Sequence, residues 1–402
     1  MRARHELVPP RIVAAVRQAR AARGGPLCAY IYDLAALAAR ARAMTGGLPG
    51  GVRLYYAVKA NAHPAVLAAL APVVHGFDIA SGGELAKVGA AASTARGSFG
   101  GPGKTDEEIE AALRAGVEFI NAESIHDLSR IDHAAARVGG RAPVLLRVNP
   151  RGRLVTGSHQ MTGAPTQFGI DERQLGAAVA HARRCPRVVI RGLHLHAVSN
   201  NPDAAAHVEF AARCLELAEQ ATRRFDVPLP VVNLGGGLGI DYSGGGAHFD
   251  WDLFAGGLRA AVAARPDSTV ILEPGRFLVA PCGYYAAEVL DLKHNHGAAF
   301  AVLRGGSHHF RLPAAMRWSH PFAVVDIDGW PYPFPRPEIR NSQVTVAGEL
   351  CTTSDVLARA SPVERLRAGD ILIFPLAGAY GWEISHRDFL SHPHPDTILL
   401  HQ

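Results

Sequence analysis

Short apolar segments alternate with Ala-rich amphipathic segments over residues 27–275, and this alternation constrains the fold more than any other feature of the sequence. The apolar runs are continuous, as strands buried on both faces require. They cover residues 27–32, 53–60, 74–80, 117–122, 142–150, 188–198, 230–237 and 269–275, and the helical segments between them include 34–44, 64–71, 106–115 and 204–225. Thr105 followed by Glu108 indicates a capping box. The alternation predicts a parallel (β/α)8 barrel rather than an open sheet.

The pattern changes after residue 276. Helical periodicity fades, and short β-type runs are separated by Gly- and Pro-containing turns such as GWPYPFPRP at 329–337. A chain of 402 residues has room for about two to three domains. We therefore expect a barrel over 27–275 and a mostly antiparallel β domain over 276–402, which the N-terminal segment 1–26 joins.

Composition and charge exclude several classes of protein. Apolar residues make up 48% and charged residues 19%, which favours a large core over disorder. The net charge is +5, but Lys and Arg are scattered without a basic block, which argues against nucleic-acid binding. No apolar run has the length of a membrane span or a signal peptide. Five cysteines at wide spacings fit neither a disulfide framework nor a zinc site, so we expect a cytoplasmic protein without a metal.

Polar residues gather where the predicted strands end. In a (β/α)8 barrel these positions surround the catalytic mouth. They are Lys59, Asp78, Ser81, Arg147, Asn149, His194, His196, Ser199, Gly235–Gly237, Glu273 and Arg276. Each has an ordinary explanation when taken singly: a Lys after a strand is usually a solvated terminus, and GGG is usually a tight turn that does not match the dinucleotide fingerprint. Together they favour a binding site.

These strand-end residues include the chemical groups that binding of pyridoxal phosphate requires. Its aldehyde needs a lysine, its phosphate needs backbone N–H groups and a cation, and its pyridine nitrogen needs a carboxylate that keeps it protonated. Lys59, the Gly235–Gly237 loop with Arg276, and Glu273 supply these groups in turn. His196 is suited to stack on the flat ring.

The sequence resembles the fold-type III pyridoxal-phosphate-dependent decarboxylases, the family of the ornithine, arginine and diaminopimelate enzymes. Eight motifs carry the resemblance in order: YAVKAN, SGGEL, RVNP, an HxxS loop, GGGxG, EPGR, GxxCxxxD and AGAY. It implies that Lys59 is the Schiff-base lysine, that Glu273 pairs with the pyridine nitrogen, and that Cys351 protonates the carbanion left after CO2 departs. The resemblance also implies that the cofactor is bound by further residues of this chain, namely Asp78, His196, Ser199, Gly235, Gly236, Gly237, Gly275, Arg276 and Tyr380. It also implies a homodimer in which the Cys351 turn completes the partner's site.

Three departures from the family pattern bear on the substrate. Val198 stands where a Gly is usual before Ser199, Thr352 replaces the acid that commonly follows the cysteine, and Gln167 replaces a Lys found in many diaminopimelate enzymes. The last two argue against a cationic diamine and against the housekeeping activity. We expect Arg147, Asp355 and Arg311 to bind substrate.

The segments VLRGGSHHFRLPAAM and EPGRFLVA resemble decarboxylases of siderophore and other secondary-metabolite pathways, some of which act on an amino acid already joined to citrate. Basic residues that would suit an anionic citryl group are Arg151, Arg153, His159, His308, His309 and Arg311. The alternatives are a diaminopimelate or basic amino acid decarboxylase, an amino-acid racemase and a non-catalytic regulator. Glu273 disfavours the racemase, which generally uses Arg there, and the presence of Lys59 and Cys351 disfavours the regulator.

Overall fold

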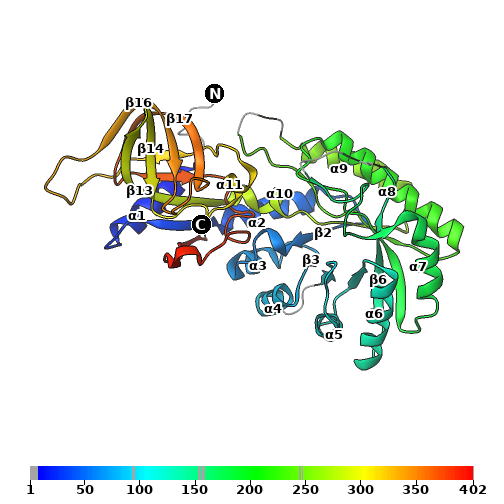
Figure 1. The fold of residues 1–402 in the computed structure, drawn as a ribbon. Coiled ribbons are helices and arrows are strands. Elements are labelled where there is room, and N and C mark those ends of the chain that lie inside the picture. Colours follow the sequence, from blue (N-terminus) through cyan, green and yellow to red (C-terminus); the bar gives the residue numbers. More distant parts are fainter. Residues whose placement is uncertain are drawn as a thin grey trace. The chain divides into compact units, whose positions relative to one another are not determined.

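The computed structural model describes residues 8–92, 96–152, 155, 159–243, 246 and 248–401. The chain forms two compact units (Figure 1). The first along the sequence, here called the sheet unit, comprises Met1–Ala36, Asp241–Gly246 and Val279–Gln402, and the barrel unit comprises Leu37–Ile240 and Ala247–Leu278.

The barrel unit is a closed parallel barrel of eight strands. In spatial order they are β2 (Val52–Ala57), β3 (Gly76–Ile79), β4 (Gly97–Phe99), β5 (Phe119–Ala122), β6 (Ala142–Asn149), β9 (Val188–His194), β11 (Val231–Asn233) and β12 (Thr269–Leu272). The β5–β6 and β12–β2 pairings close the ring. Because all eight strands run the same way, their carboxyl ends form one mouth, and the predicted (β/α)8 barrel is confirmed.

Helices follow the strands in sequence, as Figure 1 shows. They are α2 (Leu34–Gly47), α3 (Pro64–Leu70), α4 (Gly82–Ala91), α5 (Asp106–Arg114), α6 (Ile125–Arg137), α7 (Leu175–Ala182), α8 (Ala204–Phe225), α9 (Trp251–Ala263) and α10 (Arg276–Val279). The predicted capping box is present: Thr105 accepts from the Glu108 amide, and Glu108 accepts from the Thr105 amide. Two-residue strands β7 (His159–Gln160), β8 (Ile170–Asp171) and β10 (Val198–Ser199) lie in the connections.

Large side chains from five barrel strands fill part of the interior. Tyr55, Phe119, Leu145, Val231 and Ile271 form one buried cluster. A Cβ at Gly76 would lie 2.8 Å from the Tyr55 ring, so the first residue of β3 has to be glycine for this ring to fit. The barrel is therefore a packed core, and chemistry is left to the strand ends.

The sheet unit is a mostly antiparallel sheet of eight strands. These are β1 (Cys28–Asp33), β13 (Gly283–Asn295), β14 (Ala298–Leu303), β15 (Ala323–Val325), β16 (Glu338–Ala347), β17 (Val356–Arg367), β18 (Ile371–Phe374) and β19 (Asp396–Leu400). Only the β1–β19 and β14–β16 pairs are parallel among the described strands of this sheet. A short helix α11 (Leu312–Met316) follows β14.

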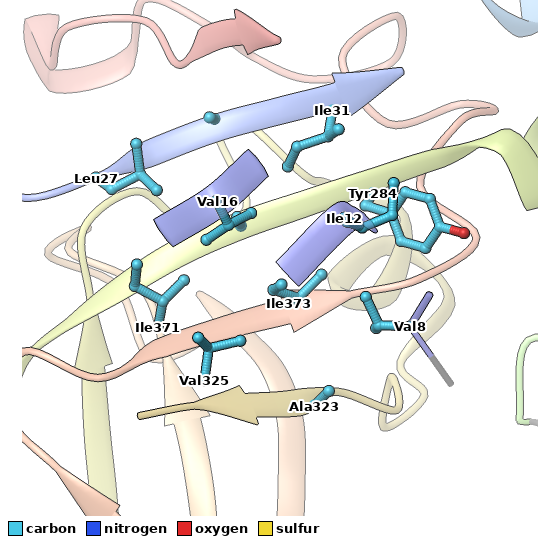
Figure 2. Close-up of a cluster of buried hydrophobic side chains, with 12 residues drawn as sticks. Val8, Ile12, Val16, Leu27, Ile31, Tyr284, Ala323, Val325, Ile371 and Ile373 are labelled. Atoms are coloured by element: carbon cyan, nitrogen blue, oxygen red, sulfur yellow. The ribbon is translucent and has the colours of Figure 1, made fainter. Parts of the chain in front are cut away.

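Helix α1 (Pro10–Ala21) packs on this sheet. Ile12 and Val16 are fully buried against Ile31, Tyr284 and Ile373 from three strands (Figure 2). Buried apolar surface contributes about 25 cal/mol per Å2 to stability. Packing of its buried side chains on the sheet therefore stabilises α1 more than its intrinsic helix propensity does.

The observed units differ from the predicted domain boundaries at residues 27 and 275. Residues 28–33 pair with β13 and β19 of the sheet unit, so the predicted first barrel strand lies in the other unit. The barrel instead gains β4, Gly97–Phe99, whose three residues are too few to show any periodicity.

Candidate active site

Three charged residues from neighbouring strand ends meet at the mouth of the barrel. Lys59 lies in a 3-10 turn (Val58–Ala60) directly after β2, Asp78 lies in β3, and Glu273 follows β12. The Lys59 Nζ atom is 2.9 Å from Asp78 Oδ2. The Asp78 and Glu273 side chains are buried, whereas the Lys59 side chain is 44% exposed. The amine is therefore held by a buried carboxylate and is still accessible to a ligand.

The two carboxylates have opposite pKa shifts. Burial, followed by the negative charge of Glu273, raises the pKa of Asp78. Burial also raises the pKa of Glu273, but His194, Lys59 and a hydrogen bond from Asn233 together outweigh it and lower the pKa below its usual value. Asn233 Nδ2 donates to Glu273 Oε1 at 2.5 Å. Glu273 is thus ionised at neutral pH, as a partner for a protonated ring nitrogen must be.

Two histidines follow one another at the end of β9. His194 Nε2 lies 3.3 Å from Glu273 Oε2, yet neither ring nitrogen of this buried side chain has a well-formed hydrogen bond among the described residues. His196 Nδ1 accepts the Gly236 amide at 3.0 Å. Burial, with the charges of Lys59 and Arg147, lowers the pKa of His196 well below its usual value. His196 is therefore a neutral imidazole that is hydrogen-bonded to the glycine loop.

The glycine loop after β11 comes too close to its neighbours for any side chain. A Cβ at Gly235 would lie 2.3 Å from His196 Nδ1, one at Gly236 would lie 2.3 Å from the Glu273 carbonyl oxygen, and one at Gly237 would lie 2.7 Å from the Val198 carbonyl oxygen. Gly235 and Gly237 also have positive φ. The loop backbone is therefore in direct contact with its neighbours, which requires glycine at all three positions.

Ser199 and Arg276 lie together beside this loop, since Arg276 Nη2 donates to Ser199 Oγ at 3.2 Å. Val198 belongs to β10, with an extended backbone that any residue can adopt, so the absence of the usual Gly does not distort the segment. Gly275 has its Cβ position 2.9 Å from Ala60 Cβ and thereby lets the Lys59 turn approach closely. An amine, an ionised carboxylate, a neutral ring and an arginine with a glycine loop are thus the groups that the site offers to pyridoxal phosphate.

Arg147 lies in β6 and is already paired. Its Nη1 is 2.6 Å from Glu123 Oε1, and its guanidinium lies 4.6 Å from the centre of the Phe168 ring. Glu123 Oε2 also accepts the Gly169 amide at 2.9 Å. The predicted substrate contact of Arg147 therefore stays a prediction, and its visible role is to hold the segment that follows β6.

Asp355 differs from the prediction that it binds substrate. Only 1% of it is exposed, and its two carboxylate oxygens accept the Ser307 amide at 2.6 Å and the Leu350 amide at 2.9 Å. Gly306 and Gly348 make room for the carboxylate, because a Cβ at either would lie within 2.6 Å of it. Asp355 is therefore committed to holding the turn that carries the exposed Cys351.

The predicted citryl-binding residues differ in their exposure to solvent. His308 and His309 have no exposed surface and cannot contact a substrate as the structure stands, whereas Arg311 and Arg151 are exposed. Arg153 and the side chain of His159 lie outside the part of the chain that the structure describes. Tyr380 lies in the sheet unit with a positive φ of 52°.

The sequence analysis did not select Asn233, and it placed His194 at a strand end without giving it a role, although both residues contact Glu273. The signal in the sequence was position: Asn233 lies two residues before the Gly235–Gly237 run, and His194 lies two residues before His196. Within the described residues no group of three or more His, Cys, Asp or Glu side chains is arranged to hold a metal ion. No described helix has the length and apolarity needed to cross a membrane.

The fold and the site define a pyridoxal-phosphate enzyme with an alanine-racemase-like barrel and a C-terminal β domain. Residues 34–280 match the pyridoxal-binding domain of the pyridoxal-dependent decarboxylases. The chain belongs to this family. Its cofactor is pyridoxal 5'-phosphate and its reaction is a decarboxylation, as the sequence predicted.

Relatives span almost the whole chain. A 2-[(L-alanin-3-ylcarbamoyl)methyl]-2-hydroxybutanedioate decarboxylase of Staphylococcus aureus is 40% identical over 394 residues, 98% of each chain. A diaminopimelate decarboxylase of Neisseria meningitidis is 34% identical over 81% of this chain and 76% of its own. The crystal structure of diaminopimelate decarboxylase from Helicobacter pylori complexed with L-lysine is 26% identical, with a TM-score of 0.84 over 96% of this chain and 94% of its own.

Proposed function

We propose that the protein decarboxylates an amino acid whose side chain is joined through an amide to a hydroxydicarboxylate, as in siderophore precursors of the citryl-diaminopropionate type. The observation that carries the proposal is the 40% identity, over 98% of both chains, to the Staphylococcus aureus enzyme whose name describes such a substrate. Diaminopimelate decarboxylases are less similar, at 34% identity or below.

The Cys351 turn supports an uncharged or anionic distal group. Cys351, Thr352, Thr353 and Ser354 are all exposed, and none carries a carboxylate. Asp355, the nearest acidic residue after them, is buried, and its carboxylate oxygens already accept hydrogen bonds from backbone amides. A distal ammonium group would find no carboxylate on the exposed face of this turn, and its loss of hydration would go uncompensated.

The residues of the barrel mouth have separable roles in this proposal. When bound, pyridoxal phosphate supplies an aldehyde that condenses with amines and a ring that accepts the electron pair released as CO2 leaves. Lys59 would hold the cofactor covalently through its amine, and Glu273 would keep a proton on the ring nitrogen. His196 would stack on the ring, while Ser199, the glycine loop and Arg276 would bind the phosphate. Asp78 orients the Lys59 amine.

Cys351 returns a proton from Sγ to the substrate carbon, and we propose that it does so in the site of a second copy of the chain. Phe389 and Leu390 are 48% and 46% exposed, and Leu390 and Ser391 both have the left-handed backbone that is uncommon outside glycine. His392 follows them and lies 3.6 Å from Glu349, two residues before Cys351. An exposed apolar pair beside this turn supports a subunit contact there.

The five cysteines are all free, which supports a reducing compartment such as the cytoplasm. This assignment is independent of the substrate.

The substrate proposal is tested by CO2 release from a panel of amino acids: the citryl conjugate of diaminopropionate, diaminopimelate, ornithine, lysine and arginine. We expect kcat/KM for the conjugate to exceed the others by about 100-fold, or about 2.7 kcal/mol of barrier. Thr352→Glu should lower this ratio, because it places a carboxylate where a cationic end needs one. Thr353→Glu is the matched control for added charge in the same turn. Preference of the unaltered protein for diaminopimelate would replace the proposal with the housekeeping activity.

A further inference from the structure

Two asparagines bind the segment after His196 to the glycine loop. The Asn201 amide donates to the Gly237 carbonyl oxygen at 2.7 Å, and Asn200 Oδ1 accepts the Ile240 amide at 2.8 Å. Asn201 is buried, and a Cβ at Gly239 would lie 2.5 Å from its carbonyl oxygen. The backbone from Gly237 to Ile240 is thus held from one side along its length.

His207, on the first turn of α8, contacts the same loop from within the barrel unit. It is 1% exposed, its Nδ1 accepts a hydrogen bond from Asn201 Nδ2 at 3.3 Å, and its ring lies near the backbone of Gly236. Its Cε1 atom is 3.4 Å from the Cβ position of Gly237. The aromatic rings of Phe210, Phe249 and Phe254 surround it with centroid distances of 5.4 to 5.8 Å.

The surroundings keep this imidazole neutral. Burial lowers the pKa of His207 to about 4, and the Gly236 contact opposes the shift. Since Nδ1 accepts from Asn201, the proton of the neutral ring is on Nε2, which is the tautomer able to donate to a carbonyl group. A phenylalanine would pack equally well among these three phenylalanine rings. The polar contacts therefore explain why this position holds a histidine.

We infer that His207 and Asn201 are positioning residues that hold Gly236 and Gly237 in the conformation that binds the cofactor phosphate. Glycine has the largest conformational freedom of any residue, and a loop with several glycines loses that freedom when a ligand binds unless the protein has already restrained it. The Gly236 amide is held by His196 and its backbone is contacted by His207, so this residue is restrained from two sides. This inference rests on the proposed role of the loop in phosphate binding.

The test compares pyridoxal phosphate with pyridoxal, which lacks the phosphate, in titrations of the full-length apoenzyme. His207→Phe retains the packing volume and removes both polar contacts. We expect its Kd for pyridoxal phosphate to rise about tenfold and its Kd for pyridoxal to change less than twofold, and the 31P resonance of the bound cofactor to shift. His320→Phe is the matched control, because His320 is also buried, donates to the Pro375 carbonyl oxygen at 2.7 Å and packs on Phe310 and Phe374. It should lower stability without changing the ratio of the two Kd values.

Asn201→Ser supplies a second test that does not depend on the folding of the first variant. It keeps the backbone bond to Gly237, loses the contact with His207, and should raise the ratio by about threefold, with less than additive effect in the double variant. Gly236→Ala tests the loop itself. If Gly236→Ala weakens binding of pyridoxal phosphate selectively while His207→Phe and Asn201→Ser leave the ratio unchanged, the inference is wrong and the phosphate site stands. If none of the three changes the ratio, the loop does not bind the phosphate.

Discussion

The Lys59 amine lies 2.9 Å from the carboxylate of Asp78, a residue in the neighbouring barrel strand. The carboxylate is buried and the amine is partly exposed, so the pair fixes the nitrogen at the mouth and leaves it open toward a ligand. The first prediction follows from this pair. Lys59→Ala should abolish the covalent attachment of cofactor that borohydride traps, whereas Lys87→Ala, an exposed lysine on α4, should not. Mass spectrometry of the reduced protein checks it, and label on a lysine other than Lys59 contradicts it.

Glu273→Gln should cost turnover far more than cofactor affinity. The amide keeps the size of the side chain and its contact with Asn233, but it cannot hold a proton on the ring nitrogen by charge. We expect kcat to fall at least 100-fold, about 2.7 kcal/mol, with Kd for pyridoxal phosphate within about threefold. A loss of kcat below about tenfold would falsify the role of Glu273 in keeping the ring protonated.

Cys351→Ala should change the product as well as the rate. Without the Sγ proton, CO2 loss would continue, but protonation at a cofactor carbon would release a carbonyl product and leave the amino group on the cofactor as pyridoxamine phosphate. The ratio of amine to carbonyl product, measured by mass spectrometry, should fall in this variant. Cys282→Ala, a buried cysteine outside the turn, should leave the ratio unchanged.

Mixing Lys59→Ala with Cys351→Ala protein tests whether the site is shared between two chains. In a freely exchanging symmetric dimer half of the molecules are mixed and each has one intact site, so about a quarter of the wild-type rate of amine formation should return. Native mass spectrometry establishes whether subunits exchange. Exchange without recovery places Cys351 outside the partner's site.

Asp355→Asn should reproduce the product change of Cys351→Ala. The amide NH2 would face an N–H group of Leu350 or Ser307, and losing one such buried bond costs about 1–3 kcal/mol. We expect a lower urea midpoint, more carbonyl product and unchanged affinity for pyridoxal phosphate. A rise in KM with the product ratio intact would instead support the direct substrate contact that the sequence predicted.

Stability should fall between about pH 6.5 and pH 4. Burial lowers the pKa of His207 and His320 to about 4 and that of His309 to about 3, so these side chains stay neutral in the folded protein while the unfolded chain takes up protons below pH 6.5. Each such group lowers the stability by up to about 1.4 kcal/mol per pH unit over that range. Urea midpoints at pH 7 and pH 5 measure the effect. His320→Phe should reduce the difference between them, and an unchanged difference would contradict its neutral, buried state.

The order of motifs along the chain and the type of most barrel elements were determined by local sequence. Continuous apolar runs identified most of the barrel strands, and the residues at their ends already indicated a cofactor and a reaction class, because parallel strands bring those ends together whatever the details of packing. Helix starts such as Thr105 depend on side chains a few residues away, so they too could be read directly.

Tertiary structure alone decided which sheet each strand joined and which polar residues were accessible. Residues 28–33 are as apolar as a barrel strand, but they pair with β13, more than 250 residues away in the sequence. Asp355, His308 and His309 are residue types typical of a binding site, yet all three are buried, and Gly306 and Gly348 make room for the Asp355 carboxylate. Nothing in the sequence distinguishes His207 from other polar residues of its helix, and only the structure shows that it contacts Asn201 and the glycine loop. Burial and pairing depend on contacts between distant parts of the chain, and a local pattern contains no information about them.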